Sequence, residues 1–219
     1  MSELIVPDWP APKNVRAAMT TRHADLATLK LPGEPAWLKQ VHGTTVVRAA
    51  PGTPEADASF TTDTRVVCVA KSADCLPVLF CDDAGSVVAA AHAGWRGLAA
   101  GVLEATVRAL PVRAETLIAW FGAAIGPRSF EVGPEVREAF VKHDAKAAEH
   151  FRLRQARGSG HPEKYLADLY GLARQRLAVV GVTRTFGGGL DTFADRERFF
   201  SYRREGSTGR MAALVWLER

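Results

Sequence analysis

The chain has 219 residues, of which 47% are hydrophobic and 24% are charged, and its formal net charge is +4 at pH 7. This composition is typical of a folded globular protein and excludes a disordered chain or an integral membrane protein. The basic residues are scattered, apart from RLRQAR at 152–157 and the pair Arg203–Arg204. A nucleic-acid partner is therefore not predicted.

The N-terminus has no signal-peptide pattern, and the longest apolar stretches are far shorter than the roughly 20 residues that span a bilayer. We therefore expect a cytoplasmic protein with no membrane partner. The oligomeric state is left open by the sequence.

Short apolar or β-branched segments separated by Gly, Pro, Asp or Ser predict the strands. In chain order these strands are expected at 15–21, 44–50, 65–71, 76–82, 86–92, 116–125, 199–204 and 211–217. Three helices are expected from apolar residues at helical spacing. They follow Gly97, follow Pro134, and run from about 164 to Gly181, and an exposed loop is expected at 154–164. Strands and helices that mix without strict alternation predict an α/β (α+β) fold in a single domain, 1–219.

The three cysteines, Cys68, Cys75 and Cys81, are seven and six residues apart and form no C-x-x-C pair. This spacing excludes a zinc ribbon and a thioredoxin motif. Cys68 and Cys81 lie in apolar segments and are expected to be buried hydrophobic residues. Cys75 lies in a turn between two predicted strands and does not fit that expectation.

The stretch AAAHAGWRGLAAG at 89–101 places His92 at the end of an apolar strand and Arg96 at the start of a helix. Backbone N–H groups at such a helix start favour an anion, and a guanidinium adds a positive fork. The alternative is a core histidine bonded to a backbone carbonyl, with Arg96 on the surface.

Two further stretches place metal-binding residue types at predicted turns. KQVHG at 39–43 carries His42, and SADCLPV at 72–78 carries Cys75. If both converge with His92, two imidazoles and a thiolate form a zinc ligand set with an open fourth position. The competing interpretation is three residues satisfied within the core, because the spacing alone does not force them together.

Seven segments resemble one protein family: WLKQVHGTTVV, ADASFTT, SADCLPVLFCD, AAAHAGWRGLAAGV, AAIGPRSFEVG, KYLADLYGLARQRL and FFSYRREGSTGRMAALVWL. The chain is similar to the multicopper-oxidase-like, or laccase-domain, family from about residue 4 to 217. Bacterial members are also called peptidoglycan editing factors, polyphenol oxidases or purine nucleoside phosphorylases. The resemblance implies that His42, Cys75 and His92 are zinc ligands, and that helices surround inner sheets in a layered α/β fold.

The resemblance also implies phosphorolysis of adenosine, guanosine, inosine and methylthioadenosine, and hydrolytic deamination of adenosine. The expected partners are a small purine nucleoside and phosphate. Phosphorolysis needs cations that hold phosphate, and the arginines of the matching motifs are Arg96, Arg128, Arg203 and Arg204, with Arg96 favoured. Asp57, in ADAS, is either an acid–base or ligand-supporting residue or a plain turn aspartate.

Three other functions remain as alternatives. A hydrolase that cleaves an amide of a peptidoglycan precursor would use the zinc, or Cys75 as nucleophile with His42 or His92 as base. A copper-dependent polyphenol oxidase is less well supported, because a laccase needs paired histidines and this chain has six scattered ones. A binding module without catalysis has little support.

The sequence departs from the family in two places. Only HADLATLKLPGEPA at 23–36 joins two motifs that are usually farther apart, so we expect residues to be missing between Arg22 and Pro32. The segment FGGGLDTF at 186–193 carries Asp191 where the family commonly has a cysteine, so no role is transferred to that position.

Overall fold

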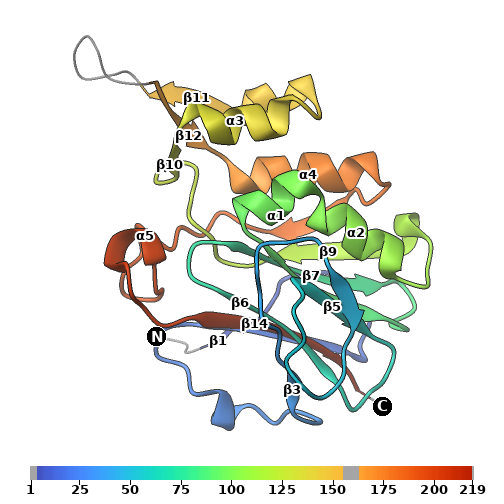
Figure 1. Cartoon of the computed structure of the whole chain (residues 1–219). Coiled ribbons are helices and arrows are strands. Elements are labelled where there is room, and N and C mark those ends of the chain that lie inside the picture. The colour runs from blue at the N-terminus through green and yellow to red at the C-terminus, as the bar shows by residue number, and fades with distance from the viewer. Residues whose placement is uncertain (1–3, 155–162, 219) are drawn as a thin grey trace.

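Two large sheets form the centre of the molecule. The computed structural model describes residues 4–154 and 163–218 (Figure 1). In order across the five-stranded sheet, the strands are β1 (Leu4–Ile5), β2 (Val15–Thr20), β14 (Met211–Leu217), β6 (Val67–Ser72) and β3 (Pro35–Ala36). In order across the six-stranded sheet, they are β13 (Arg184–Gly187), β9 (Leu117–Phe121), β7 (Leu76–Asp82), β8 (Val88–Ala93), β5 (Ala58–Thr61) and β4 (Val46–Arg48). Both sheets are mixed, with parallel pairing of β3 with β6, β4 with β5, and β13 with β9.

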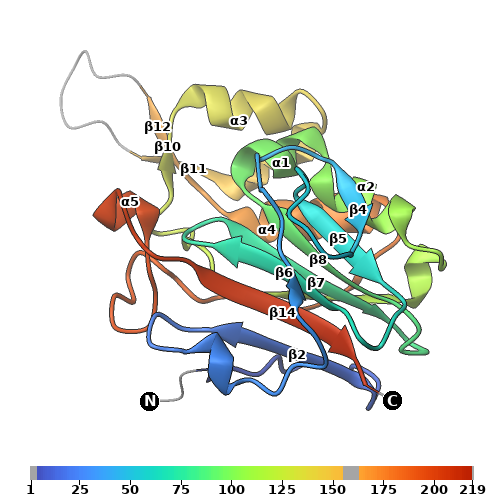
Figure 2. The same ribbon diagram turned by 60° about the horizontal axis from the view of Figure 1, so that its bottom comes forward.

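The core between these sheets follows from the alternation of side chains along the strands. Met211, Ala213 and Val215 of β14 face the six-stranded sheet, where they pack with Leu79 and Trp120. The intervening residues of β14 face the other way and belong to a separate apolar cluster. Figure 2 shows β14 running between β2 and β6. Because apolar residues occupy both faces of β14, the strand reads in sequence as an uninterrupted apolar run.

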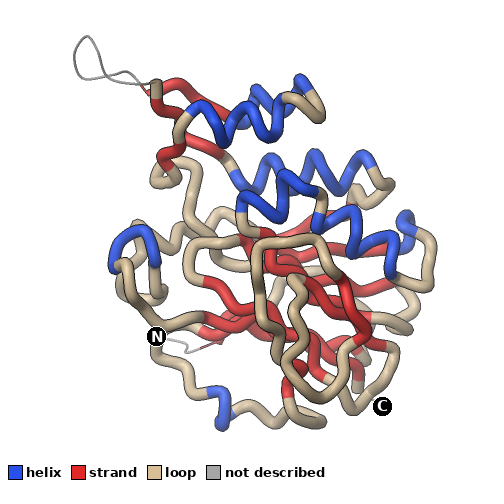
Figure 3. Tube along the Cα trace, in the orientation of Figure 1, coloured by secondary structure: helices blue, strands red, loops and turns tan. Residues whose placement is uncertain are grey.

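Helices cover the other face of the six-stranded sheet. They are α1 (Trp95–Ala100), α2 (Val102–Ala109) and α4 (Leu169–Val179), and Figure 3 shows them on one side of the strands. Beyond them lies a small antiparallel sheet of β10 (Glu131–Val132), β12 (Lys164–Ala167) and β11 (Phe151–Arg154), with α3 (Pro134–Val141) and a 3-10 helix (Ala145–His150). Two more 3-10 helices lie at Leu26–Thr28 and Ala114–Thr116. The predicted α/β fold with layered mixed sheets and flanking helices is confirmed.

The first predicted helix is divided at Gly101, whose φ of 100° lies in the left-handed region. This conformation ends α1 and begins α2, and glycine adopts it without the steric cost of a Cβ atom. The third predicted helix begins later than expected. Residues Lys164–Ala167 form β12, and the helix starts only after Asp168, whose side chain accepts a hydrogen bond from the Tyr170 N–H. Pairing with β10 and β11 overrides the helical spacing before that cap.

The strand predicted at 199–204 is wrong. Phe199 is buried, but the chain then turns into a short helix, α5 (Tyr202–Glu205). Ser201 caps this helix by accepting a hydrogen bond from the Arg204 N–H. The strand predicted at 116–125 is shorter than expected: β9 begins at Leu117 and ends at Phe121. The strands predicted at 76–82 and 211–217 have the predicted bounds.

The segment between Arg22 and Pro32 forms a short connection that contains a turn and the 3-10 helix Leu26–Thr28. That residues are missing from this connection stays a prediction. The connection covers the outer face of the five-stranded sheet with three leucines and Trp37, namely Leu26, Leu29, Leu31 and Trp37.

The predicted loop at 154–164 lies between β11 and β12, and residues 155–162 of it are outside the described residues. None of the helices within residues 4–154 and 163–218 combines the length and apolar character that a membrane crossing requires.

Candidate metal centre

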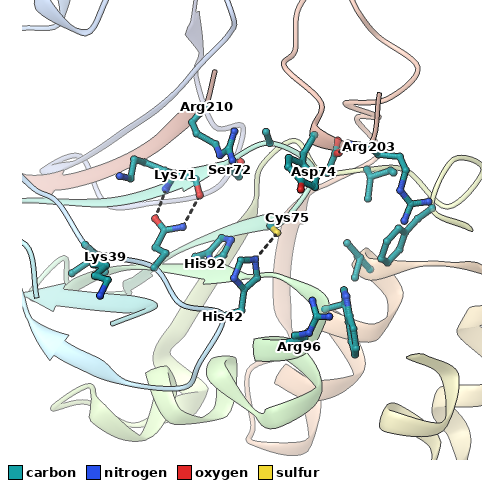
Figure 4. Close-up of a pocket in the computed structure, with 18 residues that line it drawn as sticks. Lys39, His42, Lys71, Ser72, Asp74, Cys75, His92, Arg96, Arg203 and Arg210 are labelled. Carbon is teal, nitrogen blue, oxygen red and sulfur yellow. Dashed lines mark hydrogen bonds between the residues drawn. The ribbon is translucent and has the colours of Figure 1, made fainter. Parts of the chain in front are cut away.

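Three segments that are distant in sequence bring their side chains to one point. His42 lies in the loop between β3 and β4, Cys75 in the connection from β6 to β7, and His92 in β8. Their ligating atoms all lie within 4.8 Å of one another (Figure 4). Within the described residues, this is the one group of three or more metal-binding side chains with such spacing. The fold therefore supplies the convergence that the sequence spacing left open.

Asp57 holds the loop that carries His42. Its carboxylate accepts hydrogen bonds from the backbone N–H groups of Val41, His42 and Gly43, at 3.1, 2.9 and 2.7 Å. His42 has a φ of 62°, a left-handed conformation that costs free energy for a residue with a side chain. The three bonds to one buried carboxylate stabilise this conformation and point the imidazole toward Cys75.

The same carboxylate orients His92. Nδ1 of His92 lies 2.8 Å from Oδ1 of Asp57, and both side chains are buried. A carboxylate only accepts, so Nδ1 carries the proton and Nε2 is left free as a ligand atom. Burial alone lowers the pKa of His92, but hydrogen bonds to Asp57 and Cys75 outweigh it and raise this pKa to about 9. Burial raises the pKa of Asp57, but its bonds to His92 and to the loop N–H groups lower it overall.

Cys75 differs from the other two cysteines. Its Sγ lies 3.7 Å from Nε2 of His42. Burial raises its pKa, but hydrogen bonds from His42 and His92 outweigh that effect and lower the pKa to about 6. Burial raises the pKa of Cys68 and of Cys81 to about 12, and both are free and buried as predicted. Cys75 is thus the cysteine suited to act as a thiolate.

The turn that carries Cys75 is held in place by the side chain of Asp74, a residue with a φ of 87°. Its carboxylate accepts hydrogen bonds from Oγ1 of Thr192, at 2.6 Å, and from Oγ of Ser201, at 3.0 Å. It also accepts the Arg203 N–H at 2.7 Å. The C-terminal segment before β14 is therefore tied directly to the residue next to a ligand.

Two glycines of the AAAHAGWRGLAAG segment pack against the ligands. A Cβ atom at Gly94 would lie 2.6 Å from Cδ2 of His42 and 2.9 Å from Sγ of Cys75. At Gly97 it would lie 2.9 Å from the Gly43 oxygen. The helix start can approach the ligand loop this closely because these positions have no side chain.

The donor set fits zinc. Two imidazole nitrogens and a thiolate are ligands that zinc prefers, and a catalytic zinc keeps three protein ligands and one open position. Asp57 adds the carboxylate–histidine contact that commonly supports such ligands. The same three donors are also compatible with copper, so the geometry alone does not choose between the two metals.

A cavity of about 690 Å³ opens over these three residues. Its cationic lining residues are Lys39, Lys71, Arg96, Arg203 and Arg210, and its aromatic ones are Trp95, Phe130 and Tyr202. The single carboxylate among the lining residues is that of Asp74, which is fully engaged. The cavity therefore combines a cationic lining with flat apolar surfaces, which suits an anionic or mixed polar–aromatic ligand.

Of the residues predicted to contact substrate, Arg96 and Arg203 line the cavity and Asp57 does not. Arg96 lines the cavity, with its guanidinium 4.5 Å from the centre of the Trp95 ring. Arg203 also lines it and donates to the Glu131 carbonyl. Asp57 lies behind the ligands and is not among the lining residues.

Two other arginines from the matching motifs are not positioned for a ligand. Arg128 is exposed and does not line the cavity. Arg204 donates to three backbone carbonyls, those of Thr192, Phe193 and Phe199, so its guanidinium stabilises the protein itself. These two could not be distinguished from Arg203 by sequence, because all three stand in matching motifs.

Sequence reasoning missed three polar residues of the cavity, Lys71, Ser72 and Arg210. It also missed Gln40, whose side-chain amide donates to the Lys71 carbonyl and accepts the Lys71 N–H, both at 2.8 Å. The available signal was weak. Gln40 stands in KQVHG, and Arg210 stands just before the apolar run of β14.

Asp191, at the position where a cysteine was expected, has a structural role. Its carboxylate accepts a hydrogen bond from Oγ of Ser129 at 2.6 Å and from the N–H groups of Phe193 and Ala194. It therefore joins two loops and does not line the cavity.

Comparison with known proteins agrees with the fold. Residues 11–218 match the family model described as multi-copper polyphenol oxidoreductase laccase. A protein of Escherichia coli K12 named purine nucleoside phosphorylase YfiH is 49% identical over 250 aligned positions, covering 99% of this chain and 100% of that protein. Purine nucleoside phosphorylase PA4543 of Pseudomonas aeruginosa is 48% identical over 246 positions, with both chains fully covered. These alignments are longer than 219 residues, so the relatives contain residues that this chain lacks.

The solved structure of protein NMB0706 from Neisseria meningitidis superimposes with a TM-score of 0.90 and 43% identity over the whole of both chains. The structure of YlmD from Geobacillus stearothermophilus, at 22% identity and a TM-score of 0.77 over 94% of this chain and 93% of that one, shows the same fold. The chain belongs to the multi-copper polyphenol oxidoreductase laccase family.

Proposed function

We propose that this protein is a zinc-dependent purine nucleoside phosphorylase that acts in the cytoplasm on adenosine, inosine, guanosine and methylthioadenosine. The observation that carries the proposal is the convergence of His42, Cys75 and His92 at the base of a cationic cavity with aromatic walls. The names of the similar proteins in Escherichia coli and Pseudomonas aeruginosa support the choice of reaction.

In the proposed reaction, an oxygen of hydrogen phosphate forms a bond to C1′ of the ribose. The bond between C1′ and the purine nitrogen breaks, and its electron pair goes to the base. The proton of the hydrogen phosphate ends on the released purine, so the products are ribose 1-phosphate and the neutral base. The chain has to hold an anion on one side of the sugar and a planar base on the other.

His42, Cys75 and His92 would hold the zinc, which when bound supplies Lewis-acid chemistry. Asp57 orients His92 through Nδ1, so that Nε2 is the ring nitrogen that would face the metal, and it fixes the loop of His42. The aromatic lining residues provide flat apolar surface for a purine, and the cationic lining residues provide charge for phosphate.

Adenosine deamination belongs to the same proposal as a second activity of the same site. In that reaction water adds at C6 of the purine and ammonia leaves, giving inosine. A metal that activates water is suited to this step, and related chemistry is known for zinc deaminases.

A thiol hydrolase is the second candidate, because Sγ of Cys75 lies 3.7 Å from Nε2 of His42. This pair has the arrangement of a nucleophile and its base. Its substrate class would be the amide of a peptidoglycan precursor. Activity that survives complete zinc removal would favour this candidate over the phosphorylase.

The test incubates purified protein with adenosine, with and without phosphate, and follows adenine, inosine and hypoxanthine by chromatography, while metal content is measured by mass spectrometry. We expect purine release that requires phosphate, stops on chelation and returns with zinc. His92→Ala should lose activity and bound metal, whereas the exposed His143→Ala should keep both. Full activity in metal-free protein, or copper with phenol oxidation in its place, would contradict the proposal.

A further inference from the structure

One wall of the cavity carries polar groups that the metal centre does not use. Lys71 and Ser72 end β6, and Arg210 directly precedes β14, whose first residue, Met211, pairs with Ser72. Lys71, Ser72 and Arg210 all line the cavity. In Figure 4 they lie together on the opposite side of His42 and Cys75 from Arg96. We call these three residues the β6–β14 wall.

The hydroxyl of Ser72 has no partner among the described residues. Its Oγ is buried and makes no hydrogen bond, and the residue is 2% exposed. A buried hydroxyl without a partner costs free energy, so such groups in native structures commonly mark a place where a ligand or water binds. Because Ser72 lines the cavity, a ligand in the cavity can supply the missing acceptor.

The positions of the wall residues are fixed by contacts to the backbone. The amide of Gln40 holds both backbone groups of Lys71 at 2.8 Å. Nη1 of Arg210 donates to the carbonyls of Thr208 and Gly209, at 2.8 and 3.0 Å. Nε and Nη2 of Arg210 donate to no acceptor within residues 4–154 and 163–218, so this edge of the guanidinium is available to a ligand. The side chain is thus anchored and still has free donors.

A serine hydroxyl beside a guanidinium is a common arrangement for a phosphate oxygen, because both donate and the guanidinium also carries charge. We propose that Ser72 and Arg210 form the subsite for inorganic phosphate. This inference rests on the proposed phosphorylase function and deepens it. It also differs from the expectation that Arg96 holds the phosphate.

The geometry of the reaction agrees with this assignment. In a displacement at C1′, phosphate and the leaving purine lie on opposite faces of the ribose. Figure 4 shows Arg96 and Arg203 away from the β6–β14 wall. Their guanidinium groups lie 4.5 Å and 5.5 Å from the ring centres of Trp95 and Phe130, respectively, so these aromatic rings lie on that side of the cavity. Phosphate on the β6–β14 wall and purine on the aromatic side place the ribose next to the metal ligands.

The first experiment measures phosphate binding directly. Inorganic phosphate is titrated into the full-length protein, with and without zinc, by isothermal calorimetry. We expect Ser72→Ala and Arg210→Gln each to weaken binding by about tenfold, the loss of one charge-assisted or buried hydrogen bond. Ser59→Ala removes a second buried hydroxyl, one that does not line the cavity, and Arg113→Gln removes an exposed arginine, so neither should change phosphate binding.

The second experiment measures steady-state kinetics with phosphate and inosine varied separately. Ser72→Ala and Arg210→Gln should raise KM for phosphate by about tenfold and leave KM for inosine within about twofold, whereas Arg96→Gln should leave KM for phosphate unchanged. Arg210 is exposed, so its substitution tests the subsite without threatening the fold. Thermal unfolding of each variant provides the check.

The outcomes separate the subsite from the function. Phosphate binding equal to wild type in both variants would overturn the subsite even if phosphorolysis is observed. Phosphate binding that depends on Ser72 and Arg210, without turnover of any purine nucleoside, would overturn the proposed function and keep the subsite. If the variants weaken binding of inosine 5′-monophosphate but not of inorganic phosphate, the wall holds a phosphoryl group attached to a substrate, and the proposal for free phosphate fails.

Discussion

A single carboxylate connects two of the three candidate ligands. Asp57 accepts the N–H of His42 and faces Nδ1 of His92 through the same oxygen atom. The sequence leaves two interpretations of Asp57 equally open, a functional residue or a plain turn aspartate, because an aspartate before a strand is common. The structure shows four contacts to one carboxylate, and it is this number, invisible in the sequence, that identifies Asp57 as a positioning residue.

Asp57→Asn tests this role at the scale of one residue. The amide keeps the size of the side chain but replaces one acceptor oxygen with a donor, so it weakens the loop of His42 and the orientation of His92. We expect zinc affinity to fall by about 10–100-fold, measured by competition with a chromophoric chelator. Asp63→Asn, which alters a half-buried aspartate paired with Arg65 and outside the cavity, should leave zinc affinity unchanged. Equal affinities in both variants would show that Asp57 does not support the metal centre.

The strands that were predicted with their bounds are those buried on both faces. β14 is apolar throughout and β7 is apolar up to its last residue, Asp82, and no local signal competes with pairing. One error occurs where a side chain from a distant part of the chain intervenes. The segment 199–204 has strand-like residues, yet Asp74, more than 100 residues away, accepts the Ser201 hydroxyl and the Arg203 N–H and fixes a helical turn.

In the candidate site, too, local features could be predicted from the sequence and long-range contacts could not. Its ligand types and their positions near strand ends could be predicted from the sequence. Their convergence could not, because 33 and 17 residues separate them and only the arrangement of two sheets brings them together. The residues of the β6–β14 wall were missed because their significance depends on contacts between Gln40 and Lys71 and on the burial of Ser72.

The hairpin that joins β7 to β8 depends on Asp82. Its carboxylate accepts the N–H groups of Ser86 and Val87, at 2.7 and 3.1 Å, and the Ser86 hydroxyl at 2.8 Å. Burial raises the pKa of Asp82, but these hydrogen bonds outweigh it and lower the pKa below its usual value. The turn therefore contributes stability above the pKa of the unfolded aspartate, and that stability is lost as the pH falls through the lower pKa of the folded state.

Asp82→Asn should thus destabilise the protein by about 1 kcal/mol at pH 7, the value of a hydrogen-bonded carboxylate at a turn. The difference from wild type should shrink as the pH falls below about 4. Urea unfolding at a series of pH values measures it, and Asp8→Asn, at an exposed position, is the control. A difference that grows toward low pH would contradict the assignment.

At the scale of the whole molecule, the metal centre joins parts of both large sheets. Cys75 lies on the connection between the five-stranded and the six-stranded sheet, His92 lies in the six-stranded sheet, and His42 lies in a loop that follows β3 of the five-stranded sheet. A metal bound there would link segments whose separation depends on the packing of the two sheets. Binding to the folded chain alone stabilises it by mass action.

We therefore expect zinc at about 100 times its dissociation constant to stabilise the protein by about 2.7 kcal/mol. For a chain of this size, such a gain corresponds to a rise in Tm of about 5–10 °C. Calorimetry with added zinc, and with a chelator, measures the shift. Cys75→Ser should show a much smaller shift, and an equal shift in this variant would place the stabilising zinc elsewhere.

The side chain of Gln40 protects an unpaired strand edge from pairing with a strand of another molecule. β3 pairs with β6 only at Val67 and Cys68, so the outer edge of β6 is without a neighbouring strand at Lys71. An unpaired strand edge is a template for aggregation, since its N–H and C=O groups can accept a strand from another chain. The amide of Gln40 engages both backbone groups of Lys71 and removes them from that edge. The loop that carries a candidate metal ligand thus also shields the sheet from intermolecular strand addition.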